Sequence, residues 1–75
     1  MNNSRRKQIA KAITQLEDVQ QSIEEIKDEE QDAFDNMLES LQDAERGETM
    51  MNWVDLLEDA LSNIEEAHDN LENIE

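Results

Sequence analysis

The chain lacks most of the residues that hold very small proteins together. Its 75 residues include no cysteine, no proline, one glycine and two aromatic residues, Phe34 and Trp53. Without cysteine, disulfides and thiolate metal sites are excluded. Apolar residues make up 36% of the chain, below the roughly 45–50% of an average globular protein. A large single-chain core is therefore excluded, and a core in a chain this short rarely supplies more than ~3–5 kcal/mol.

Basic residues are also scarce. Six Lys and Arg face 21 Asp and Glu, for a formal net charge of −15. Residues 1–11 carry a net +4 and residues 12–75 a net −19. This field repels nucleic acid and anionic membranes and attracts basic proteins. Because no apolar run approaches the ~20 residues of a membrane span, we expect a cytoplasmic protein with no direct nucleic-acid or membrane contact.

Apolar residues recur at heptad spacing in both halves of the chain, which predicts two long amphipathic helices. The stripe of the first half is Ile9, Ala12, Leu16, Val19, Ile23 and Ile26. The stripe of the second half is Met50, Trp53, Leu57, Ala60, Ile64, Ala67, Leu71 and Ile74. Val54, Leu61 and His68 each follow a stripe position and widen it. A wide stripe suits a helix with two neighbours better than a two-stranded seam.

These helices predict an all-α fold, an antiparallel, coiled-coil-like helical hairpin that assembles into a four-helix-bundle homodimer or higher oligomer. The single domain has helices over about 4–34 and about 48–74, joined by a connector or short helix over about 35–46. Asp35 and Asn36, both weak helix formers, predict a break that equalises the two helix lengths. Gly47 is expected just beyond a helix end with positive φ, before a helix that opens at Glu48 or Thr49.

Antiparallel pairing also predicts ion pairs where the two ends of the chain meet. It brings Arg5, Arg6 and Lys7 beside Asp69, Glu72 and Glu75. Glu30 interrupts the first stripe, so either the seam opens there or Lys27 or Arg46 reaches its carboxylate.

Acidic residues dominate the outer positions of the second helix, and almost no lysine offsets them. They are Asp55, Glu58, Asp59, Glu65, Glu66, Asp69 and Glu72. Like charges three or four residues apart destabilise a helix, so a function is one interpretation: the carboxylates bind a basic protein and mimic nucleic acid. The other is a solvated face that only keeps the protein soluble.

Six apolar residues around the connector are candidate oligomer or partner contacts. They are Phe34, Met37, Leu38, Leu41, Met50 and Trp53. Trp53 is expected in a core, either of the hairpin or of an oligomer, and otherwise anchors a partner. General-base catalysis by His68 would need an orienting partner and a cleft, so His68 is interpreted as packing, or as a mild pH sensor if it is buried near acids. We expect no catalytic residue, metal site or cofactor.

The middle of the chain resembles a known group of proteins. The segment Ala33-Phe-Asp-Asn-Met37-Leu-Glu-Ser-Leu-Gln42, followed by Glu45-Arg-Gly-Glu48 and Met50, is similar to the AFDNxPESLQxxERGExM pattern of small acidic helical-hairpin proteins of bacteria and their phages. The tail of LEEA-type heptads extends the resemblance over nearly the whole chain, with Leu38 at the proline of the pattern. The resemblance implies a hairpin and a phage or mobile-element context, but no activity.

Two functions remain open. The first is a non-catalytic binding module of phage or mobile-element type that presents its carboxylates to a basic protein, as a nucleic-acid mimic or an inhibitor of a host defence system. The alternative is a structural or adaptor coiled coil whose apolar stripe or connector contacts a helical partner.

Overall fold

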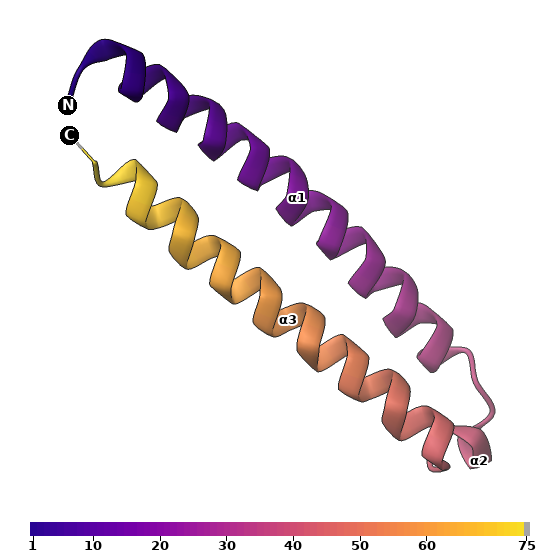
Figure 1. Cartoon of the computed structure of the whole chain (residues 1–75). Helices are drawn as coiled ribbons and strands as arrows, with labels where there is room; N and C mark the ends of the chain where they lie inside the picture. The colour runs from indigo at the N-terminus through magenta and orange to yellow at the C-terminus, as the bar shows by residue number, and fades with distance from the viewer. Residues whose placement is uncertain (75) are drawn as a thin grey trace.

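The computed structural model describes residues 1–74 and is all-helical over that range, with 88% helix and no strand. Two long helices, α1 (Asn3–Asp35) and α3 (Glu45–Glu72), run antiparallel and are joined through a single-turn helix, α2 (Glu39–Gln42). The molecule is a rod of 58 × 14 × 12 Å whose two termini lie together at one end (Figure 1). The rod is a helical hairpin.

α1 ends where the comparison of helix lengths predicts a break. Its last residue is Asp35, and Asn36 is the C-cap. At its other end, the Asn2 side chain accepts a hydrogen bond from the Arg5 backbone N–H at 2.8 Å, which satisfies one of the free N–H groups of the first turn. The connector is held to α1 because the Gln42 side-chain amide donates to the Phe34 carbonyl at 2.9 Å.

Gly47 does not occupy the position that the sequence predicts. It lies in the first turn of α3, which begins at Glu45, and no glycine in residues 1–74 has positive φ. Gly47 is buried, and a Cβ added to it would stand 2.8 Å from the Gln42 Cα. The glycine is needed because the end of α2 packs its backbone directly onto α3, leaving no room for a side chain.

The seam between the long helices is shifted from the predicted stripe. On α1, Val19 and Ile26 are 47% and 52% exposed, while Gln20 and Lys27 are partly buried in their place. On α3, Val54, Leu61 and His68 face α1, although the sequence pattern places them beside the predicted stripe. The α3 seam is Met50, Val54, Leu57, Leu61, Ile64, His68 and Leu71, all buried or partly buried. Trp53 lies beside this seam and is 53% exposed, so the hairpin itself does not form a core around it.

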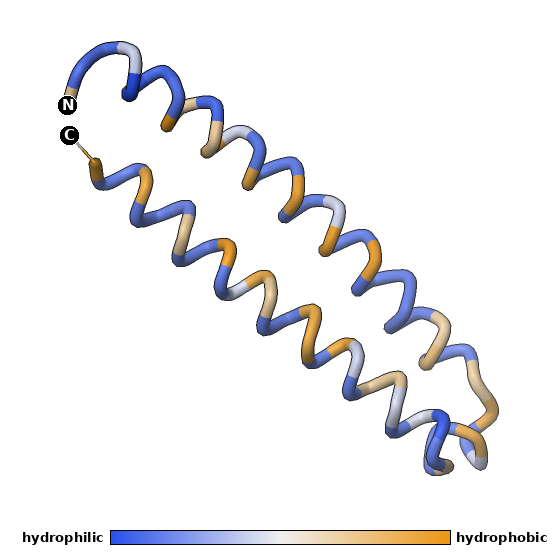
Figure 2. Tube along the Cα trace, viewed as in Figure 1, coloured by the Kyte–Doolittle hydropathy of each residue, from blue (hydrophilic) through white to orange (hydrophobic). Residues whose placement is uncertain are grey.

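The apolar core of the hairpin is small. Among residues 1–74, the buried apolar side chains are Met50 and Val54, with 8% and 2% of their surface exposed. Both belong to the half of α3 near the connector, and α1 contributes no buried residue. Apolar residues recur along both helices (Figure 2), but most of them stay partly open to solvent. In residues 1–74, no helix has the length and apolar character that crossing a membrane requires.

Candidate interaction surfaces

The acidic residues of α3 form a continuous exposed surface. All seven predicted members, here called the α3 acidic surface, are exposed, and none falls on the seam. They are Asp55, Glu58, Asp59, Glu65, Glu66, Asp69 and Glu72. The helix positions them because they occupy heptad positions outside the α3 seam.

His68 gathers three carboxylates at one edge of this surface. Its Nδ1 lies 3.0 Å from Glu72 Oε1 and 3.8 Å from Asp69 Oδ1, and its Nε2 lies 3.4 Å from Glu17 Oε2 of α1. The His68 side chain is 16% exposed, whereas these carboxylates are 55–67% exposed. Its Nε2 is buried without a hydrogen-bond partner. His68 is thus a seam residue rather than the flanking residue that the sequence predicts.

The prediction that Arg5, Arg6 and Lys7 form ion pairs with the acids at the other end of the chain is wrong for residues 1–74. Within residues 1–74, the close contacts between a basic side chain and a carboxylate all involve His68, which is charged only when it is protonated. Arg6 shares a groove with Glu72, but its Nε donates to the Met1 carbonyl at 3.3 Å. Neither Lys27 nor Arg46 forms an ion pair with Glu30, which lies at the open edge of the seam. Glu75 lies outside the described residues.

One broad face of the hairpin carries almost no charge. It consists of the positions beside the seam, repeated every seven residues on each helix, and is here called the neutral face. On α1 these positions are Gln8, Ala12, Gln15, Val19, Ser22, Ile26, Glu29 and Ala33. On α3 they are Thr49, Trp53, Leu56, Ala60, Asn63, Ala67, Asn70 and Ile74. Glu29 is its one acid.

The corresponding positions across the seam, here called the opposite face, are strongly acidic. These sixteen positions, as many as on the neutral face, hold nine acids and one lysine. On α1 they are Lys7, Ala10, Thr14, Glu17, Gln21, Glu24, Asp28 and Gln31. On α3 they are Glu48, Met51, Asp55, Glu58, Ser62, Glu65, Asp69 and Glu72. The hairpin therefore separates its charge across its long axis.

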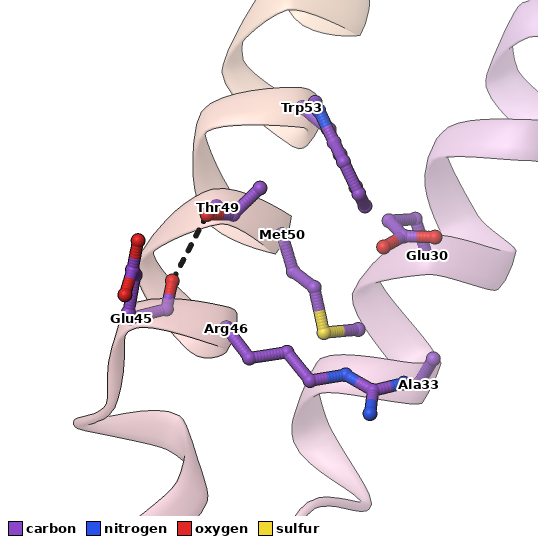
Figure 3. Close-up of a pocket in the computed structure, with 7 residues that line it drawn as sticks. All are labelled: Glu30, Ala33, Glu45, Arg46, Thr49, Met50 and Trp53. Atoms are coloured by element: carbon purple, nitrogen blue, oxygen red, sulfur yellow. Dashed lines mark hydrogen bonds between the residues drawn. The ribbon is translucent and has the colours of Figure 1, made fainter.

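Trp53 stands between two grooves on the neutral face. The groove toward the connector has a volume of about 620 Å³, and Glu30, Ala33, Arg46 and Met50 are among its lining residues. Figure 3 shows the Trp53 indole and the Arg46 side chain extending from α3 toward α1. The second groove, of about 380 Å³, shares Glu30 and Trp53 with the first. Its other lining residues are Ile26, Leu56 and Leu57.

The candidate contacts around the connector do not form one patch. Phe34 and Met37 are partly buried and Met50 is buried in the hairpin. Leu38 and Leu41, in contrast, are 72% and 48% exposed.

The sequence pattern did not predict that Val19, Ile26 and Leu56 of the neutral face are exposed. Heptad spacing alone does not separate these residues from the seam, because the seam and the neutral face both repeat every seven residues.

Residues 1–74 contain no cluster of three or more His, Asp or Glu side chains placed to hold a metal ion. Comparisons with protein-family models, curated proteins and solved structures find no match to the chain.

Proposed function

We propose that this protein is a non-catalytic binding module of phage or mobile-element type that presents the α3 acidic surface to a basic protein in the cytoplasm. The observation that supports this proposal is the separation of charge: nine acids lie on the opposite face and one on the neutral face. A face that served solubility alone would mix lysine with glutamate. Instead, like charges are neighbours along the helix, an arrangement that lowers helix stability.

The spacing of the carboxylates suits a protein that otherwise binds nucleic acid. Asp55 and Glu72 lie about 26 Å apart along the helix axis at 1.5 Å per residue. Seven carboxylates over that length give about one charge per 4 Å, compared with about 3.4 Å per phosphate along one DNA strand. The module would thus occupy a basic groove as a nucleic-acid mimic and inhibit its owner, such as a component of a host defence system.

A competition experiment tests this function. A fluorescent DNA duplex bound to a basic DNA-binding protein such as a histone is titrated with the hairpin at 50 mM salt. We expect displacement of the DNA, and we expect it to weaken steeply as the salt concentration rises. No displacement at 50 mM salt would remove the proposed mimicry for that protein.

A matched pair of variants separates an ordered acidic surface from net charge alone. Glu58→Lys, Glu65→Lys and Glu72→Lys together reverse one row of the α3 acidic surface. Asp18→Lys, Glu25→Lys and Asp32→Lys change the net charge equally but lie in an exposed row on α1, outside the α3 acidic surface and the opposite face. The proposal expects at least a tenfold larger loss of competition from the first triple variant. Equal losses would contradict it.

The exposure of Leu38 and Leu41 favours a second candidate function. The two leucines lie three residues apart at and within the single-turn helix α2. If they form one contact site, the protein is an adaptor coiled coil that binds a helical partner. In that case charge reversal on α3 leaves partner binding intact, whereas Leu38→Ser with Leu41→Ser abolishes it.

A further inference from the structure

The hairpin leaves several apolar side chains of its two long helices exposed on one side. Four large neutral-face residues keep about half or more of their surface exposed: Val19 at 47%, Ile26 at 52%, Trp53 at 53% and Leu56 at 64%. Against these, two apolar side chains are buried within residues 1–74. Ile26, Trp53 and Leu56 line one groove, and contiguous exposed apolar surface marks a protein contact in soluble proteins. The wide stripe of each helix therefore has one neighbour in the hairpin and lacks a second.

Charge identifies what can cover this face. Each chain carries a formal −15, so two copies repel each other through most of their surfaces. The neutral face carries much less charge: its sixteen positions include one acid, Glu29, and the grooves beside Trp53 add the acids Glu30 and Glu45 and the base Arg46. Its polar residues are uncharged serine, threonine, asparagine and glutamine, which hydrogen-bond to one another without a charge penalty. A second copy of this chain is thus electrostatically acceptable here.

The face also changes along its length in a way that sets the orientation of the second copy. Its bulky residues, Ile26, Trp53 and Leu56, gather in the half near the connector. Its alanines toward the termini are Ala12 and Ala67. Two copies in the same direction would place bulk against bulk and alanine against alanine. Opposite directions place the Trp53 half of each copy on the alanine half of the other.

The register can be followed from the contacts between the helices. Glu17 lies level with His68 and Glu30 level with Trp53, which puts the midpoint of the paired region near Ser62. Leu56 is about 9 Å from that midpoint along the axis. A two-fold axis across the rod therefore sets Leu56 over the space between Ala67 and Asn70 of the second copy.

The same orientation brings opposite charges together. Residues 1–11 carry a net +4, and the two-fold axis sets them beside the connector of the other copy. That connector and its flanks are acidic through Asp35, Glu39, Asp43, Glu45 and Glu48. The ion pairs that the basic residues do not make within residues 1–74 of their own hairpin then become available between copies.

We propose that a second copy of this chain covers the neutral face, with its hairpin antiparallel to the first, and that the pair forms a four-helix bundle. Its interior contains Val19, Ile26, Trp53 and Leu56 of both copies, and the α3 acidic surfaces remain outside. This inference goes beyond the proposed function and does not depend on it, because it involves the neutral face and not the α3 acidic surface.

Molar mass across concentration tests the interface. We expect light scattering to give twice the chain mass of 8.7 kDa at micromolar concentration. Ile26→Glu with Leu56→Glu adds two charges to the neutral face at exposed positions, and we expect it to raise the dissociation constant at least 100-fold. Thr14→Glu with Ser62→Glu adds the same charge to the opposite face and should leave the dimer intact. A helical wild-type monomer, or equal dissociation of both variants, would overturn the proposal.

Cysteine cross-linking tests the orientation, since the chain contains no cysteine. A mixture of Leu56→Cys and Asn70→Cys should form a disulfide-linked heterodimer in the antiparallel arrangement. A mixture of Leu56→Cys and Glu29→Cys links only if like ends lie together, because these two residues are level within one hairpin. Linkage of the second mixture but not the first would overturn the antiparallel arrangement.

Discussion

The two long helices have similar lengths but contribute very differently to the packing. α3 supplies every buried residue of its hairpin, whereas α1 supplies none over Asn3–Asp35. The α3 seam is apolar except at His68, while the α1 seam is interrupted by Gln20, Lys27 and Glu30. Val19 and Ile26 are apolar and adjacent in sequence to Gln20 and Lys27, but they lie beside the seam and not on it. α1 thus divides its apolar residues between the seam and the exposed neutral face.

The largest expected effect comes from shortening seam residues on each helix. Met50→Ala removes one of the two buried apolar side chains and should lower the free energy of unfolding by about 2–3 kcal/mol. Ile23→Ala on α1 should lower it by only about 1 kcal/mol, because Ile23 is partly exposed. Urea denaturation followed by circular dichroism, at one protein concentration, measures both. Equal losses would show that the two helices contribute alike.

Gly47 provides the next test: whether Gly47→Ala raises or lowers the free energy of unfolding shows whether α2 packs closely on α3. Alanine normally stabilises a helix interior relative to glycine by about 1 kcal/mol. Here the added methyl meets the Gln42 backbone, so Gly47→Ala should lower the free energy of unfolding by about 1–3 kcal/mol. Asn52→Ala, at an exposed position of the same helix, is the control and should raise it by a few tenths of a kcal/mol. A more stable Gly47→Ala protein would mean that α2 does not pack closely on α3.

Replacing a polar residue of the α1 seam with an apolar one is expected to stabilise the hairpin. Gln20 is partly buried on the seam, whereas Gln21 beside it is exposed. Gln20→Leu should raise the free energy of unfolding by about 1 kcal/mol, because it buries apolar surface against α3. Gln21→Leu should leave it unchanged. Thermal melts of both variants at equal concentration measure the difference, and a matching gain from Gln21→Leu would contradict the seam assigned here.

The smallest expected effect lies in the connector, outside both long helices. Leu38 is 72% exposed with φ −59° and ψ 142°, angles that proline adopts without strain. Its carbonyl accepts from the Leu41 and Gln42 N–H groups, which proline preserves. Leu38→Pro should raise the free energy of unfolding by about 0.4–1 kcal/mol by restricting the unfolded chain. A thermal melt that shows destabilisation instead would mean that Leu38 contributes through its N–H or its side chain.

Much of this architecture can be predicted from the sequence. Heptad spacing predicts the two long helices, and the weak helix formers Asp35 and Asn36 mark the end of α1. The α3 acidic surface is equally predictable, because positions b, c and f of a heptad face away from the apolar stripe whichever neighbour covers it. The connector resisted prediction at Gly47, since a glycine required by close backbone contact looks the same in sequence as one that ends a helix.

The sequence by itself determined that two amphipathic helices form, where the first ends and which side of α3 is acidic, because these depend on spacing and local propensity. Only the tertiary structure decided which part of each wide stripe makes the seam. Positions such as Trp53 and Val54 are both apolar and adjacent, and local propensity does not rank them. The short connector sets how the helices face each other, and that constraint buries Val54 while it leaves Trp53 on the neutral face.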